Sequence, residues 1–253
     1  MNPDPVPSRI AAFFDLDGTL IPFPTLERRL VSALLYRHAI PISNVAWWPL
    51  AFARLAARGL AHARQANKMH FRGISAELTA RLAGQLTGRP RLPFFPQALD
   101  CVAWHASQGH RIALVTGTPQ FLARCVAFSL EEQLAQRGLA ITVLVRATIL
   151  EGAAGRWTGR VSGEPMFGGA KATAVDSLAS RLHLDPRHCY GYGDSLHDCP
   201  MLERLGHPIA ANPSQSLRRC AIRRGWQVAD WEVQGRQAGR KFPFLKTKVE
   251  TLG

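Results

Sequence analysis

Short apolar runs, each followed by a polar residue or a turn, recur along the chain and predict buried strands. They are Arg9–Phe14, Arg111–Val115, Ile141–Val145, Cys189–Gly193 and Pro208–Ala211. Strands of a parallel sheet that is covered on both faces have continuous apolar runs of this kind, rather than an alternation of apolar and polar residues. The pattern therefore favours a parallel sheet inside the protein.

Stretches with helical spacing of apolar residues lie between these runs, at Gln97–Ser107, Pro119–Arg137, Ala170–Leu182, Pro200–Leu205 and Ser214–Gly225. Pro119 suits the first position of a helix. Strands that alternate with helices predict a doubly wound (Rossmann-like) α/β fold, in which ligands bind at the carboxyl ends of the strands. The glycine-rich segment Gly152–Gly163 predicts a β-hairpin or a loop.

The segment Pro22–Pro93 departs from this alternation, because it has a helical pattern and little strand signal. It begins after the first strand and ends before the second, so an insertion there would lie beside the strand ends. We therefore predict a core of residues 1–21 and 93–253 and an inserted helical cap of residues 22–92.

The composition of the 253 residues, 47% of them hydrophobic, is typical of a globular protein. No apolar run approaches the roughly 18 residues that a membrane-spanning helix needs. The proline-rich N-terminus does not resemble a secretory signal, and the five cysteines are scattered without a CxxC pair. We therefore expect no disulfide framework and no thiolate zinc site, and we expect a cytoplasmic location.

The formal net charge of +13 indicates attraction to an anionic partner, although a general bias towards arginine and alanine is an alternative cause. The excess is concentrated in the predicted cap. Between Arg28 and Ala76 there is no aspartate or glutamate, and the basic residues there are Arg28, Arg29, Arg37, Arg54, Arg58, Arg64, Lys68 and Arg72. We expect these charges, Arg64, Lys68 and Arg72 among them, to attract an anionic substrate.

The first strand ends in two carboxylates that are one residue apart, Asp15 and Asp17, and Gly18 and Thr19 follow. Carboxylates at the end of a buried strand are costly unless a cation or a proton compensates them. Two such groups can divide the chemistry, one attacking and one moving protons. Gly18 allows a sharp turn and a close approach of the backbone to a ligand. A solvated Asp-Gly turn is the alternative.

Two further carboxylates, Asp194 and Asp198, follow another predicted strand. If a helix begins there, their spacing of four residues places both on one face. Carboxylate oxygens are the ligands that magnesium prefers. An ordinary helix cap, which aspartate and serine favour, is the alternative.

Thr116 and Gly117 end the strand Arg111–Val115, where a hydroxyl and free backbone N–H groups can bind a phosphate. Lys171 lies at the start of another predicted helix. Either feature alone has an ordinary explanation, as a helix cap or as a solvated lysine.

Taken together, the four segments resemble the motifs of the haloacid dehalogenase superfamily of phosphatases: DLDGT at 15–19, Thr116, Lys171 and GDSLHD at 193–198. Phe95–Arg124 and Phe167–Asn212 are most similar to the phosphoserine-phosphatase-like branch (subfamily IB hydrolases). In that branch a helical cap of the C1 type is inserted after the first motif, which is where residues 22–92 lie.

The resemblance implies a phosphatase in which Asp15 attacks phosphorus and becomes an aspartyl-phosphate, while Asp17 moves protons to the leaving alcohol and from water. The phosphate-binding residues would be Gly18, Thr116, Gly117 and Lys171. The resemblance further implies a Mg2+ cofactor bound by Asp15, Asp194 and the backbone carbonyl of Asp17. Asp198 would support the site by orienting Lys171 or a water on the metal.

The sequence departs from that branch in one respect. Phosphoserine-specific members usually have a glutamate shortly after the first motif, which binds the ammonium group of the substrate. Here residues 21–25 read IPFPT, and Glu27 is the only acid nearby. Strong selectivity for phosphoserine is therefore not expected, and a small or amphiphilic phosphomonoester with more anionic character suits the cap better.

Two alternatives stay open at this point. An alcohol instead of water can accept the phosphoryl group, which would make the protein a phosphotransferase. A basic module that binds membrane or nucleic acid is the other alternative, although nucleic acid is not expected as a partner. Val45–Leu60, with Trp47 and Trp48 beside arginines, would suit weak contact with an anionic membrane surface or ordinary packing within the cap. His38, His62 and His70 lack metal-ligand spacing, and the oligomeric state is left open.

Overall fold

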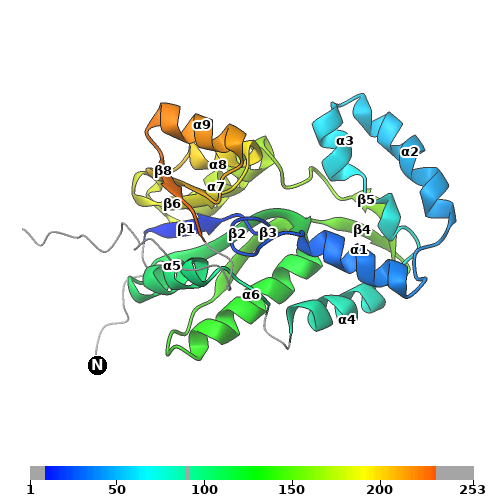
Figure 1. Ribbon diagram of the computed structural model, residues 1–253, viewed down its shortest axis with the longest axis horizontal. Coiled ribbons are helices and arrows are strands. Elements are labelled where there is room, and N and C mark those ends of the chain that lie inside the picture. The colour runs from blue at the N-terminus through cyan, green and yellow to red at the C-terminus, as the bar shows by residue number, and fades with distance from the viewer. Residues whose placement is uncertain (1–8, 89–91, 232–253) are drawn as a thin grey trace, which may run out of the picture.

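The computed structural model describes residues 9–88 and 92–231 of the chain, and its centre is a sheet of six parallel strands (Figure 1). Their order across the sheet is β3-β2-β1-β6-β7-β8, and every neighbouring pair is parallel. The strands are β1 (Ala11–Phe14), β2 (Arg111–Pro119), β3 (Val143–Thr148), β6 (Tyr190–Gly193), β7 (His207–Ala211) and β8 (Gln227–Ala229). The predicted doubly wound fold is confirmed.

Helices cover both faces of this sheet, and the side chains of β1 alternate between the two layers. Ala12 and Phe14 join the core beneath α5 (Pro96–Ser107) and α6 (Gln120–Ala135). Ala11 and Phe13 join the core beneath α7 (Gly169–Leu182), α8 (Cys199–Leu202) and α9 (Gln215–Arg224) on the other face (Figure 1). Because both faces are buried, β1 needs apolar residues at every position, which explains the uninterrupted run in the sequence.

A helical segment connects β1 to α5. It consists of α1 (Leu26–Tyr36), α2 (Ser43–Ala56), α3 (Leu60–Ala66), the short 3₁₀ helix η1 (Met69–Phe71) and α4 (Ala76–Thr87). The apolar side chains of α1 and α4 belong to the same core cluster as those of α5 and α6. In contrast, α2 buries Asn44 alone among its residues, and α2 and α3 stand apart from the sheet (Figure 1).

The predicted β-hairpin is present as β4 (Leu150–Ala153) and β5 (Arg156–Val161). It follows β3 in the chain, yet it packs against the inserted helices. The backbone of Trp157 exchanges hydrogen bonds with Ile74 (3.0 Å) and Gly73 (2.8 Å), and its indole N–H donates to Thr79 Oγ1 (2.8 Å). The hairpin is therefore fixed to the segment between η1 and α4.

Several predicted boundaries shift. β2 continues to Pro119, which caps α6 instead of starting it, and β3 begins two residues later than predicted, at Val143. The predicted helix at Pro200–Leu205 is the short helix α8, and Asp198 closes a 3₁₀ turn, η3 (Leu196–Asp198). The edge strand β8 has only three residues, too few for a detectable pattern in the sequence. Within the described residues, no helix combines the length and apolar character needed to cross a membrane.

Candidate active site

The strand order reverses direction around β1, and the predicted site residues gather there. From β1 the sheet extends through β2 to β3 on one side and through β6 to β7 on the other. Ligands of such sheets bind outside the carboxyl ends of the strands at this point. A cavity of about 370 Å³ lies there, and it is lined by Asp15, Asp17, Phe23, Thr25, Glu27, Arg64, Gln65, Lys68, Thr116, Gly117, Thr118, Met166, Phe167, Lys171, Asp194, Ser195 and His197.

Asp15 is held in place by both its backbone and its side chain. Its backbone N–H donates to the carbonyl of Tyr192 (2.9 Å), which continues the pairing of β1 with β6 past the end of the strand. Its carboxylate accepts a hydrogen bond from Lys171 Nζ at 2.6 Å. The side chain of Asp15 is 9% exposed and that of Lys171 is 5% exposed, so the pair is almost fully withdrawn from water.

Lys171 joins Asp15 to Asp198. Its ammonium also donates to Asp198 Oδ1 at 2.5 Å, while the other oxygen of Asp198 accepts from the backbone N–H (3.0 Å) and hydroxyl (2.9 Å) of Ser195. Burial opposes the charge of Lys171, but the two carboxylates outweigh it and raise its pKa. Lys171 is therefore a fixed cation whose position is set from two sides.

Three carboxylates, those of Asp15, Asp194 and Asp198, offer oxygens that all lie within 4.8 Å of one another. Burial raises the pKa of Asp194, and the charges of Asp15 and Asp198 raise it further. Burial likewise raises the pKa of Asp15, against the opposing effect of Lys171. One ammonium group does not compensate three buried carboxylates, and a hard divalent cation with a preference for oxygen ligands suits the remaining charge. The donor set therefore fits Mg2+.

Gly18 is required where the chain turns past these carboxylates. Its φ is +89°, and a Cβ atom at this position would lie 2.5 Å from Asp194 Oδ2. Its carbonyl accepts a hydrogen bond from the side chain of Asn212 (3.1 Å), and Asn212 begins the turn after β7. Any other residue at position 18 would displace Asp194 or strain the backbone.

Asp17 also lines the cavity, and hydrogen bonds fix its carboxyl group. Its Oδ1 accepts from the backbone N–H of Leu26 (2.7 Å), the first residue of α1, and its Oδ2 accepts from the hydroxyl of Thr118 (2.5 Å). Burial raises the pKa of Asp17, and these two hydrogen bonds offset only part of that effect. The carboxyl group of Asp17 is thus fixed by residues from the inserted segment and from β2.

Thr116 and Gly117 lie at the end of β2, and both line the cavity. Thr116 is 1% exposed, and its hydroxyl accepts from the backbone N–H of Thr118 (3.2 Å). A Cβ atom on Gly117 would lie 3.6 Å from Gln65 Oε1, so α3 approaches the strand end closely here. Neither Thr118 nor Gln65 was predicted to line the site. The position of Thr118, two residues after Thr116 at a strand end, was the available signal.

The inserted segment contributes a second buried ion pair to the cavity. Lys68 Nζ donates to both oxygens of Glu27 (2.7 and 2.8 Å), and His70 Nε2 lies 3.0 Å from Glu27 Oε1. Burial opposes ionisation of Glu27, but Lys68 and His70 together lower its pKa to about 2. Glu27 therefore neutralises Lys68, which is not free to attract an anionic substrate as we expected from the sequence. His70 also has a specific partner in Glu27. Arg72 lies outside this cavity, whereas Arg64 lines it.

The chain matches the family model of the haloacid dehalogenase-like hydrolases over residues 12–203. It is 29% identical to a Mycobacterium tuberculosis protein named phosphoserine phosphatase, over 93% of this chain and 75% of that protein. It is 30% identical to a probable phosphatase of the same species, over 87% of this chain and 75% of the relative. A histidinol-phosphatase of Neisseria meningitidis is 27% identical over 54% of this chain and 59% of its own length.

Among solved structures, a Bordetella pertussis protein with unknown function is 30% identical, with a TM-score of 0.68 over 88% of this chain and 99% of the other. A phosphoserine phosphatase in a phospho-aspartyl intermediate analogue form has a TM-score of 0.58 at 16% identity, covering 88% of this chain and 94% of that one. At that identity the likeness concerns the fold alone.

Proposed function

The chain belongs to the haloacid dehalogenase-like hydrolases and is a phosphatase, and from this premise we propose that it hydrolyses phosphomonoesters through an aspartyl-phosphate on Asp15. The observation that carries the proposal is the buried Asp15 carboxylate at the carboxyl end of β1, which accepts a hydrogen bond from Lys171 Nζ at 2.6 Å. A carboxylate positioned in this way can attack in line, with little reorganisation.

In the first step, Asp15 attacks phosphorus, the bond from phosphorus to the alcohol oxygen breaks, and Asp17 donates its proton to that oxygen. Burial raises the pKa of Asp17, which favours the protonated form that this step needs. The hydrogen bonds from Leu26 and Thr118 hold the Asp17 carboxyl group in one orientation.

In the second step, water attacks the phosphorus of the aspartyl-phosphate, and Asp17 accepts the proton of that water. The bond between phosphorus and the Asp15 oxygen breaks, so that inorganic phosphate and the free carboxylate result. In both steps the phosphoryl oxygens would be bound by the Thr116 hydroxyl, the Gly117 N–H and the Lys171 ammonium. Donors fixed before the reaction stabilise the charge that develops on these oxygens.

The residues that would hold Mg2+ are Asp15 and Asp194 through their carboxylates and Asp17 through its backbone carbonyl. When bound, the ion supplies charge neutralisation for the phosphoryl group and for the crowded carboxylates. Asp198 would position Lys171, since it shares the ammonium with Asp15.

Glu27 lies in the part of the cavity where the substrate alcohol would bind, but its charge is already matched by Lys68 and His70. A carboxylate with two cationic or proton-donating partners is a poor site for the ammonium group of an amino alcohol. We therefore propose a small phosphomonoester without strong selectivity for phosphoserine, although one relative is named for that substrate.

The test is Asp15→Asn, assayed with p-nitrophenyl phosphate and Mg2+. Turnover should fall by at least about a thousandfold, because an amide cannot attack phosphorus. Asp100→Asn, at an exposed position of α5, makes the same chemical change away from the cavity and should keep wild-type turnover. Acid quenching of the wild type with ³²P-labelled substrate should trap a phosphoenzyme that Asp15→Asn lacks. Near-normal turnover in pure Asp15→Asn would contradict the mechanism.

A further inference from the structure

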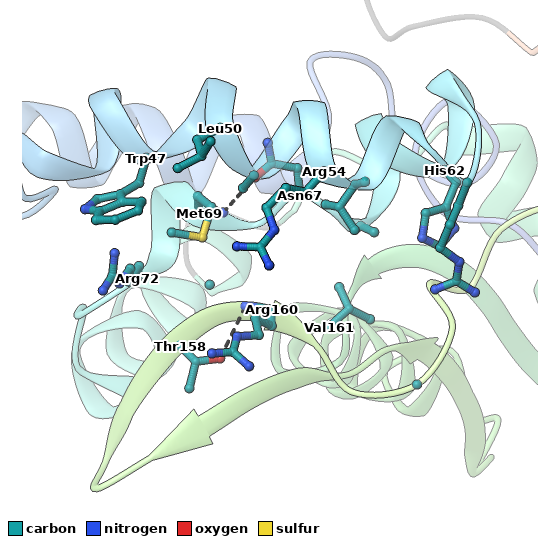
Figure 2. A pocket seen from close by; sticks show the side chains of 16 residues that line it. Trp47, Leu50, Arg54, His62, Asn67, Met69, Arg72, Thr158, Arg160 and Val161 are labelled. Carbon is teal, nitrogen blue, oxygen red and sulfur yellow. Dashed lines mark hydrogen bonds between the residues drawn. The ribbon is translucent and has the colours of Figure 1, made fainter.

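A second cavity lies between the helices α2 and α3 and the strand β5, and the proposed reaction does not use it. Its volume is about 560 Å³. Figure 2 shows the labelled side chains around the gap between α2 and the β4–β5 hairpin. The hairpin packs closely against the segment around η1 at this cavity: a Cβ atom on Gly159 would lie 3.0 Å from Met69 Sδ and 3.1 Å from Arg72 Cβ.

Arginines from separate parts of the chain line this cavity: Arg54 from α2, Arg72 after η1 and Arg160 from β5 (Figure 2). Arg58, in the turn between α2 and α3, also lines it. Arg58 is paired with Glu164, which also lies 3.7 Å from His62 Nδ1. Within residues 9–88 and 92–231, no carboxylate forms an ion pair with Arg54, Arg72 or Arg160. Like charges around one cavity repel one another, and an anion bound between them offsets this repulsion.

The rest of the lining combines polar and apolar side chains. On the apolar part, Trp47 and Leu50 of α2 are 46% and 50% exposed, and Leu55, Met69 and Val161 lie with them. The guanidinium of Arg72 lies over the Trp47 ring, 5.0 Å from its centroid. A concave surface of this size that combines apolar walls with a few charged groups is typical of a small-molecule site.

This cavity is separate from the candidate active site, because the two have no lining residue in common. Helix α3 borders both of them. His62 and Ala66 face the second cavity, whereas Arg64 and Gln65 face the active site. A ligand of the second cavity would therefore not need to contact Asp15 or its neighbours.

We propose that the cavity between α2, α3 and β5 binds a small anionic amphiphile, with its acidic headgroup on Arg54, Arg72 and Arg160 and its apolar body against Trp47, Leu50 and Val161. A guanidinium group can donate paired N–H hydrogen bonds to a phosphate or to a carboxylate, so the headgroup can be either. A purely ionic ligand such as inorganic phosphate fits less well, since it would leave the apolar part of the lining in contact with water.

Isothermal titration calorimetry with single-chain probes below their critical micelle concentrations tests this proposal. The probes are decylphosphonate, which a phosphatase cannot hydrolyse, decanoate, decyltrimethylammonium and inorganic phosphate. The test variant is Arg54→Gln/Arg160→Gln. The matched control is Arg81→Gln/Arg223→Gln, which removes the same charge at two exposed positions outside both cavities. Circular dichroism and thermal unfolding establish that both variants are folded.

Wild type and control should bind decylphosphonate or decanoate at least about tenfold more tightly than Arg54→Gln/Arg160→Gln, because charge-assisted hydrogen bonds to the headgroup are lost. The weaker binding caused by Arg54→Gln/Arg160→Gln should be the same in an Asp15→Asn background, which separates this site from the active site and the proposal from the proposed function. The proposal is overturned if the test variant binds as tightly as the wild type. It is also overturned if the cationic probe binds equally well, if inorganic phosphate binds as tightly as the amphiphiles in a manner that Arg54→Gln/Arg160→Gln weakens, or if binding is seen only with anionic lipid vesicles.

Discussion

The two cavities differ in how their charges are compensated. At the carboxyl ends of the strands, five largely buried groups form ion pairs within the protein: Asp15 and Asp198 with Lys171, and Glu27 with Lys68. In the cavity beneath α2, the arginines are exposed, and Arg54 and Arg160 form no ion pair within the described residues. Buried pairs fix positions, because desolvated charges must keep their partners. Exposed cations hold no fixed geometry but attract anions over a distance.

The difference assigns separate tasks to the two regions. Phosphoryl transfer depends on positioning and on charge neutralisation at fixed points, which the paired groups of the strand ends provide. Recognition of an anion with an apolar body needs an open surface that is positive before the ligand arrives, which the region beneath α2 provides. Removal of individual charges tests whether each behaves as a buried, paired group or as an exposed group that is free to bind an anion.

The largest effect is expected from removal of the metal. Excess EDTA should lower p-nitrophenyl phosphate hydrolysis by at least about a hundredfold, since three crowded carboxylates lose the cation that compensates them. Mg2+ should restore activity, and Ca2+ should restore it poorly, because calcium prefers more ligands at longer distances. Asp194→Asn should raise the Mg2+ concentration needed for half-maximal activity, whereas Asp176→Asn, at an exposed position of α7, should not. Full activity in excess chelator would show that the reaction does not require a bound metal ion.

A second effect concerns stability, and it tests whether the Glu27–Lys68 pair is fixed. Glu27→Gln leaves the Lys68 ammonium, whose side chain is 5% exposed, without its carboxylate. The free energy of unfolding at pH 7 should fall by about 3 kcal/mol, as is typical when one partner of a buried ion pair is removed. Urea unfolding measures this change. Glu132→Gln, at an exposed position of α6, should stay within about 0.5 kcal/mol of the wild type.

The same pair has a pH signature with a definite sign. Folding lowers the pKa of Glu27 from the ordinary 4.5 to about 2. The ion pair therefore contributes its full stabilisation above pH 4.5, and this contribution is lost as the pH falls towards 2. The difference in stability between the wild type and Glu27→Gln should shrink over that interval. A difference that is independent of pH would mean that packing, and not charge, accounts for the loss.

Much of the strand-end site could be predicted from the sequence, because strand ends in a parallel sheet converge at one edge. Asp15, Thr116 and Asp194 each follow an apolar run, and the topology brings them together. Lys171 was predictable only through its resemblance to a motif. Its actual partners, Asp15 and Asp198, depend on where α7 packs.

The contacts of the helical segment between β1 and α5 could not be predicted in the same way. Glu27 and Lys68 are 41 residues apart, and only the packing of α1 against the segment around η1 makes them partners. From the sequence, Lys68 was therefore expected to attract an anionic substrate, although Glu27 neutralises its charge. The hairpin was predicted, but its attachment to the inserted segment through Trp157 depends on contacts more than 70 residues apart in the chain. The presence of a basic residue in the sequence does not show whether its side chain is in a buried ion pair or is free to bind an anion.

The smallest effect is expected from the same substitution in the open region. Glu164→Gln removes the partner of Arg58 at the edge of the second cavity, where the side chains of Arg58 and Glu164 are 60% and 57% exposed. Its cost in stability should be within about 0.5 kcal/mol, because exposed ion pairs contribute little. The freed Arg58 adds a cation to the cavity, so the affinity for decylphosphonate should rise by about twofold to fivefold. This gain should disappear in 1 M NaCl, where the Debye length is only about 3 Å. Calorimetry at low and high salt measures the gain, and Glu132→Gln again serves as the control. A large loss of stability in Glu164→Gln, comparable to that of Glu27→Gln, would show that the edge of this cavity is built like the strand-end site and not as an open surface.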